Sequence, residues 1–218
     1  MPELDQFSPI VYGFLVNLTV LFLSFPLAYA VGLILFLAIS SAPGPIKRLL
    51  ETLNLTVRIT PVVVQLVIAY FALAAIGLSF TALTVAVMVF TIHYASFFVE
   101  KFRSSYSTIG GAQIEVAYTL GLSRSFTALR ILIPQLVIYT YSATVNGILG
   151  MVKDSAILSV IAVTDAIQAA KILAMLSFDY VGPFATAGAL FCAFYALTVQ
   201  GARFIERILR ERYGDFVG

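Results

Sequence analysis

Lys153 and Asp154 are adjacent, oppositely charged residues inside an otherwise apolar stretch that runs from Val145 to Thr164. A charge at the middle of a bilayer costs roughly 2.5–3.5 kcal/mol on insertion scales, so two adjacent charges need a reason. One interpretation places them near a membrane interface or in a structural ion pair. The other places them on the path of a zwitterionic solute, whose two charges they would complement. Asn146, seven residues before Lys153 and on the same helical face, would add a polar contact.

Signatures of catalysis and of metal or nucleotide binding are missing. No Gly-Lys dipeptide occurs, so the chain lacks a phosphate-binding loop of the P-loop type. The one histidine, His93, has no Cys or His at metal-ligand spacing and is interpreted as a packing residue. The one cysteine, Cys192, excludes an intramolecular disulfide and is interpreted as a small apolar residue. We therefore expect no catalytic residue, no metal ligand and no cofactor in this chain.

Membrane helices are the elements that would position the charged pair. Hydrophobic residues make up 61% of the 218 residues and charged residues 11%, whereas soluble domains carry about 25% charged residues. This composition excludes a disordered chain, a nucleic-acid-binding protein and an ordinary cytosolic enzyme. It predicts an all-α integral membrane protein whose residues 1–218 form a single domain.

Charge-free stretches predict five transmembrane helices, because a hydrocarbon core of about 30 Å needs about 20 helical residues. The first lies between Gln6 and Ile46, and the stretch from Ile59 to Val99 is divided into two at residues 77–81. Thr60 is expected to cap the second span and Pro61 to begin it. The fourth span covers residues 131–152 and the fifth covers residues 180–202. The shorter apolar piece between them, residues 155–164, is expected to be a re-entrant or partly inserted helix.

The distribution of basic residues predicts the orientation of the five spans. Eleven of the thirteen Lys and Arg residues lie in the loops after the first and third spans or in the C-terminal tail. The N-terminal tail, Met1–Asp5, carries two acidic residues and no basic one. Because basic residues accumulate on the cytoplasmic side, the N-terminus is predicted to lie outside and the C-terminus in the cytoplasm.

The longest cytoplasmic stretch reads as two short helices joined at a bend. Ile114–Leu120 is predicted to be a short amphipathic helix, and Gly121 suits the position after its end, where a left-handed backbone is needed. Ser123 can cap a second helix that continues into the fourth span. This element either lies on the lipid headgroups or docks a soluble partner.

The same stretch resembles the signature loop of ATP-binding-cassette importer permeases. That motif is Glu-Ala-Ala, three residues, Gly, nine residues, Ile, one residue, Leu-Pro. Here Glu115-Val116-Ala117 is followed at the matching spacings by Gly121, Ile131 and Ile133-Pro134. Val116 and Ile133 are mild departures from the motif.

Two further segments are similar to the polar amino acid importers, which include histidine and glutamine permeases. Their Arg-Gly-Thr-Pro appears as Arg58-Ile59-Thr60-Pro61, followed by Gln65. Their Leu-Lys-Asp-Thr-Ser-Leu segment appears from Val152 to Ile157, and it contains Lys153 and Asp154. Many relatives have Asn-Glu where this chain has Asn146-Gly147, and the loss of that carboxylate favours a neutral or acidic amino acid as the solute.

The resemblance implies the permease subunit of an importer in the cell membrane. It implies a second permease copy, identical or different, and an extracytoplasmic solute-binding protein. Two cytoplasmic ATPase subunits would bind the ATP and Mg and would dock on a coupling helix between spans three and four. The coupling residues would be Glu115, Val116, Ala117, Gly121 and Pro134. The residues alone leave two alternatives: a secondary carrier or channel that uses Lys153 and Asp154, and a membrane-embedded enzyme or scaffold.

Overall fold

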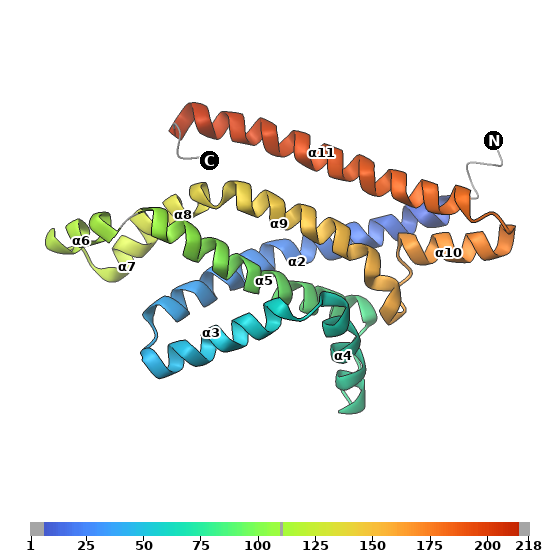
Figure 1. Cartoon of the computed structure of the whole chain (residues 1–218), viewed down its shortest axis with the longest axis horizontal. Helices are drawn as coiled ribbons and strands as arrows, with labels where there is room; N and C mark the ends of the chain where they lie inside the picture. Colours follow the sequence, from blue (N-terminus) through green and yellow to red (C-terminus); the bar gives the residue numbers. More distant parts are fainter. Residues whose placement is uncertain (1–6, 110, 214–218) are drawn as a thin grey trace.

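The computed structural model describes residues 7–109 and 111–213, which form helices and contain no β-strand. Met1–Asp5 lies outside these described residues. Most helices run along the long axis of the molecule, whereas α4 turns away from it (Figure 1). In chain order the elements are α2 (Ser8–Ser41), α3 (Gly44–Ile59), α4 (Val62–Ala75), α5 (Ala82–Ile109), α6 (Gly111–Thr119), α7 (Arg124–Thr127), the π-helix η1 (Ala128–Leu132), α8 (Ile133–Tyr139), α9 (Tyr141–Asp154), the 3₁₀-helix η2 (Ser155–Ile161), α10 (Ala166–Ser177) and α11 (Val181–Tyr213).

Four stretches of helix among the described residues are long and apolar enough to cross a membrane, namely α2, α5, α9 with η2, and α11. The bent pair α3–α4 is a fifth candidate, so the predicted number of spans agrees with the larger count. The span formed by α9 and η2, Tyr141–Ile161, corresponds to the predicted fourth span but begins ten residues after Ile131, the predicted start. Residues 155–161 therefore continue α9 and are not a separate re-entrant helix, and the chain turns only at Ala162, which has a left-handed φ of 62°.

The core of the molecule lies where α2 packs along α5. Phe90, Phe98 and Phe102 of α5 are fully buried. Tyr29 of α2 packs edge-on against Phe98 and Phe102, with ring centroids 5.3 and 5.1 Å apart. Gly32 allows this approach, because a Cβ there would lie 2.7 Å from the Cβ of Phe98. α2 and α5 thus form the scaffold on which the other helices are placed.

The chain bends by 103° between α3 and α4. Pro61 caps α4, and Thr60 does not, so the predicted capping role of Thr60 is wrong. Its hydroxyl instead donates to the carbonyl of Thr56, one turn back in α3. Gln65 closes the bend, because its Nε2 lies 2.6 Å from the Val57 carbonyl and 2.9 Å from the Thr60 carbonyl. These are carbonyls that a helix end leaves without intrahelical partners.

Charged residues of α3 pair with charged residues of α5. Arg58 contacts Glu100 at 3.5 Å, and Glu51 contacts Arg103 at 3.1 Å. The Nδ2 of Asn54, which is buried, reaches Glu100 at 3.4 Å. α3 is therefore held beside the end of α5 by polar contacts.

A buried polar junction fastens α10 to α2. Asn17 accepts a hydrogen bond from the Ala166 backbone and donates to the Ser155 carbonyl at 2.6 Å. Asp165, also buried, caps α10 by accepting from the Gln168 backbone at 2.8 Å. Gly13 makes the approach possible, since a Cβ there would lie 2.5 Å from the carbonyl carbon of Asp165.

Candidate functional site

Asp154 lies at the end of α9 and faces α5. The hydroxyl of Tyr94 donates to its Oδ2 at 2.6 Å, which fixes the carboxylate against the side of a cavity of about 280 Å³. Asn146, one of the residues predicted to act with Asp154, borders the same cavity. The lining combines these polar groups with aromatic rings and consists of His93, Tyr94, Phe97, Phe98, Lys101, Ala143, Asn146, Gly147, Gly150 and Asp154.

Two glycines of α9 allow α5 to pack closely against α9 beside the cavity. A Cβ on Gly147 would lie 3.1 Å from the ring of Phe98, and a Cβ on Gly150 would lie 3.3 Å from the hydroxyl of Tyr94. Larger side chains at these positions would displace the two rings. Gly147 thus leaves room for the Phe98 ring and contributes no charge.

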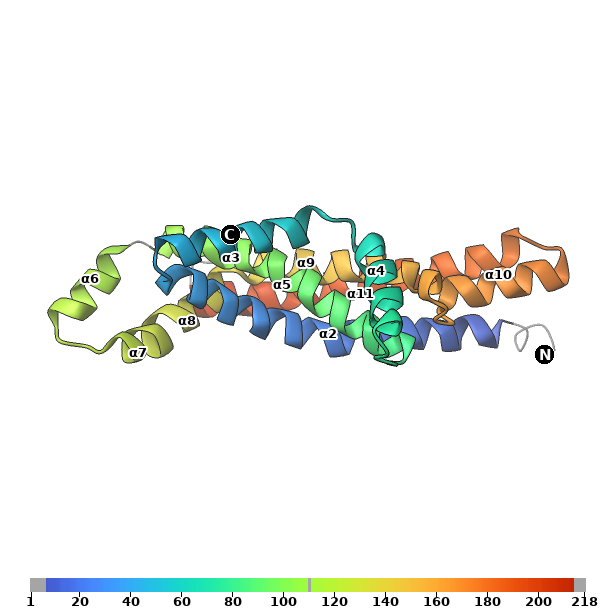
Figure 2. The ribbon, with the colours of Figure 1, turned by 90° about the horizontal axis from the view of Figure 1, so that it is seen from below.

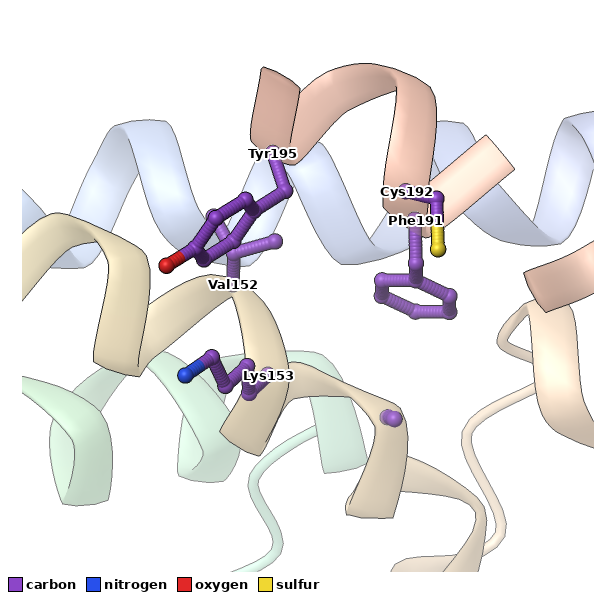
Figure 3. Close-up of a pocket in the computed structure, with 6 residues that line it drawn as sticks. Val152, Lys153, Phe191, Cys192 and Tyr195 are labelled. Atoms are coloured by element: carbon purple, nitrogen blue, oxygen red, sulfur yellow. The ribbon is translucent and has the colours of Figure 1, made fainter. Parts of the chain in front are cut away.

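Lys153 faces a different cavity from Asp154. Its Nζ lies 5.3 Å from the ring centroid of Tyr195, beside an apolar cavity of about 520 Å³ between α9 and α11 (Figure 3). Cys192 and Phe191 line the same space. No ion pair links the described side chains of Lys153 and Asp154. The two residues therefore border different cavities of the chain, and their joint role on one solute path stays a prediction.

Lys101 brings a cation to the Asp154 cavity and was missed by the sequence analysis. It follows His93 and Phe97 at intervals of four residues, so the three side chains lie on one face of α5. That spacing is a signal in the sequence, but only the packing of α5 against α9 connects it with Asp154. The cavity thus has an anionic and a cationic group on two different helices.

His93 connects this cavity to the bend between α3 and α4. Its Nδ1 lies 2.9 Å from Nε2 of Gln65, the side chain that closes the bend. His93 is buried, in line with its predicted packing role, but it also lines the cavity. His93 and Gln65 therefore form a continuous side-chain contact between the cavity and the bend.

The bent element formed by α6 and α7, which follows the C-terminal end of α5, has the predicted local structure. Gly121 has a φ of 77°, and the Leu122 backbone donates to the Ala117 carbonyl at 3.0 Å, which closes α6. The hydroxyl of Ser123 caps α7 by accepting from the Phe126 backbone at 3.2 Å. Figures 1 and 2 show α6 and α7 projecting from the end of the molecule.

α6 presents most of its side chains outward. Glu115 is exposed, as are Val116 and Leu120, at 57% and 73%. Ala117 is the buried residue that holds the helix to the rest of the element. Pro134, the last motif residue, lies in the first turn of α8, directly after η1. Since proline offers no N–H and crowds the carbonyl four residues before it, the wider π turn accommodates it.

Comparisons with known proteins give a consistent result. The profile of the family described as "Binding-protein-dependent transport system inner membrane component" matches residues 30–211. The "Probable amino-acid ABC transporter permease protein YckA" of Bacillus subtilis is 28% identical over 98% of this chain and 93% of its own length. The "Probable glutamine ABC transporter permease protein GlnP" of the same organism is 30% identical over 88% of this chain and 89% of its own.

A solved structure has a similar fold along nearly the whole chain. The "Crystal structure of an amino acid ABC transporter with histidines" superposes with a TM-score of 0.85 at 25% sequence identity. The alignment covers 94% of this chain and 96% of the other.

Proposed function

Because this chain belongs to the family of binding-protein-dependent transport system inner membrane components, we propose that it is the permease subunit of an ATP-driven importer of polar amino acids. Two permease subunits, identical or different, would enclose the solute path in the cell membrane. Two cytoplasmic ATPase subunits would bind ATP and Mg, and an extracytoplasmic solute-binding protein would deliver the amino acid. The chain itself would catalyse no reaction.

The observation that carries this proposal is the α6–Gly121–α7 element. It has the spacing of the importer signature and exposes the apolar residues Val116 and Leu120, and Figure 1 shows α6 and α7 at one end of the molecule. Val116 and Leu120 would enter a groove on the ATPase, and Glu115 would form a polar contact at its rim. Closure of the ATPase subunits would then move α5 and α8, which flank the element in the chain.

The cavity between α5 and α9 is the proposed solute site. The Asp154 carboxylate would bind the ammonium of the amino acid, and the Lys101 ammonium would bind its carboxylate. Asn146 would add a hydrogen bond, and Tyr94 would position Asp154. Because Gly147 supplies no second carboxylate, the site favours a neutral or acidic side chain. The proposed path thus keeps Asp154 and Asn146 from the sequence analysis and gives the cationic role to Lys101 instead of Lys153.

Capture of an ATPase tests this function against a secondary carrier or channel. Purification of the tagged chain from its native membrane in mild detergent is expected to bring down a subunit with a P-loop in stoichiometric amount. A carrier that couples transport to ions through Lys153 and Asp154 would be isolated without one. Recovery of a pure permease dimer that still transports its solute would contradict the proposal.

The proposed orientation can be tested with single cysteines in a Cys192→Ala background. Ser104, exposed on α5, would lie in the cytoplasm, and Ser79, exposed in the turn between α4 and α5, would lie outside. A membrane-impermeant maleimide is expected to label Ser79→Cys in intact cells and Ser104→Cys only after permeabilisation. The reverse pattern would overturn the assigned orientation, and labelling of both sites in intact cells would overturn the assignment of the spans.

A further inference from the structure

The turn between α10 and α11 presents a cluster of apolar side chains outward. Leu176, Phe178, Tyr180 and Val181, the apolar tip, are exposed by 76%, 88%, 58% and 78%. Figures 1 and 2 show this turn at the extreme end of the molecule, opposite α6 and α7. The chain buries none of these side chains in its own core, so their contacts must lie elsewhere.

The backbone of the tip is unfavourable for the residue it carries. Phe178 has a φ of 57°, in the left-handed region, and it follows the last residue of α10. Glycine is the usual residue there, because a Cβ is strained in that conformation. An aromatic ring that is 88% exposed gains almost nothing from its own chain to offset this strain. The retained ring therefore points to a contact outside the chain.

Hydrogen bonds hold the tip in place, and they engage the carboxylate of Asp179, the charged residue between Phe178 and Tyr180. Oδ1 of Asp179 accepts from the backbones of Val181 at 2.9 Å and Gly182 at 3.2 Å, which caps α11. The hydroxyl of Ser177 donates to the Leu173 carbonyl at 2.8 Å and receives the Asp179 backbone N–H at 3.3 Å. The tip therefore offers a rigid surface dominated by apolar side chains.

The length of α11 gives the depth of the tip in a bilayer. No charged residue occurs from Val181 to Ala202, a stretch of about 33 Å at 1.5 Å per residue, which matches a hydrocarbon core of about 30 Å. Arg203 follows at one end, where the Tyr141 hydroxyl donates to the Ala202 carbonyl at 2.7 Å. Val181 then falls at the opposite edge of the core. The ring of Phe7, just before α2, lies beside Gly182, so α2 begins at the same level.

We propose that the apolar tip inserts into the boundary between headgroups and acyl chains of the leaflet opposite α6 and α7, with the Phe178 ring as its anchor. Aromatic side chains favour this layer. The tip continues the exposed apolar surface of α11, a helix long and apolar enough to cross a membrane. A surface for a soluble protein would have a polar rim, whereas Asp179 is occupied in capping. The lipid contact would hold the α10–α11 turn, and through Asn17 the start of α2, at a fixed depth.

A fluorescence experiment tests the contact, because the chain contains no tryptophan. Phe178→Trp is reconstituted in phosphatidylcholine nanodiscs that contain lipid brominated at shallow or at deep acyl positions. Phe22→Trp is the matched control, since Phe22 is 63% exposed but lies in the middle part of α2. The indole of Phe178→Trp is expected to emit at shorter wavelength than in water and to be quenched more by the shallow label. The indole of Phe22→Trp is expected to be quenched more by the deep label.

Two results would overturn the proposal. Water-like emission from the Phe178→Trp variant without quenching by either label would place the tip outside the bilayer. If its emission then shifted only on addition of the solute-binding protein, the tip would be a docking surface for that receptor.

Phe178→Gly provides a second readout that a packing role would not produce. Glycine relieves the left-handed backbone, so the unfolding temperature in detergent is expected to stay the same or to rise. The additional stabilisation on transfer from detergent to nanodiscs is expected to shrink, because the lipid anchor is lost. A clear loss of stability in detergent would mean that the ring packs within the protein, against the proposal.

Discussion

Asp154→Asn is expected to weaken solute transport by roughly 10- to 150-fold in apparent affinity, which corresponds to loss of a charge-assisted hydrogen bond of about 1.5–3 kcal/mol. The amide oxygen of asparagine can still accept the hydrogen bond from Tyr94, so the fold and the position of the side chain are retained. Only the negative charge that would bind the ammonium of the solute is removed. The measurement is the concentration dependence of amino acid uptake by the reconstituted transporter.

Lys153→Met is the matched control for Asp154→Asn, because the two residues are neighbours that face different cavities. It keeps most of the aliphatic stem and removes a charge that contacts the Tyr195 ring. Uptake is expected to remain close to wild type. The opposite ranking, with Lys153→Met inactive and Asp154→Asn active, would move the solute site to the cavity beside α11.

Lys101→Met tests whether Lys101 binds the carboxylate of the solute or has a structural role. If Lys101 binds the carboxylate of the solute, its replacement lowers the affinity for amino acids but leaves that for their amides much less affected. Equal losses for both solutes would show that Lys101 acts on the fold or on the conformational cycle instead.

Gly121→Pro is expected to release the ATPase subunits from a permease that is still folded in the membrane. Proline fixes φ near −65°, which is incompatible with the 77° of Gly121, and it removes the N–H that donates to the Tyr118 carbonyl at 3.0 Å. The closure of α6 would be lost, and Val116 and Leu120 would no longer be presented together. Recovery of the ATPase with the tagged permease is expected to fall at least about tenfold, as expected for a loss of 1.4 kcal/mol or more.

Gly201→Ala is the control for this substitution. Like Gly121 it has open space where a Cβ would be placed, but it lies within α11 and has no positive φ. ATPase recovery is expected to be unchanged. Glu115→Arg tests the same contact from the exposed face of α6 without altering its backbone, and should also reduce recovery. Normal recovery with both Gly121→Pro and Glu115→Arg would refute the docking role of the element.

Local chemistry explains which features could be predicted from the sequence. The bend at Gly121 and the cap at Ser123 depend on residues within a few positions of each other, and both are present. The number of apolar stretches follows from the positions of charged and turn-forming residues along the sequence. The separation of Lys153 and Asp154 also follows from local geometry, because successive side chains on a helix point about 100° apart.

Features that depend on distant parts of the chain could not be predicted in this way. The pairing of Arg58 with Glu100 shows that α3 lies beside α5, but neither residue indicates its partner. The position of Lys101 relative to Asp154 requires the packing of two helices. Asn17 is one of a few polar residues in the mostly apolar α2, and its contact with the Ala166 backbone joins segments 149 residues apart.

The most direct test of the central claim is uptake of radiolabelled amino acids by liposomes that contain the permease, its ATPase and its solute-binding protein. The account predicts uptake of a neutral or acidic amino acid that requires ATP with Mg and persists when ion gradients are dissipated. Uptake that proceeds without the ATPase and is abolished by dissipating a proton or sodium gradient would contradict the account, and would identify the chain as a secondary carrier.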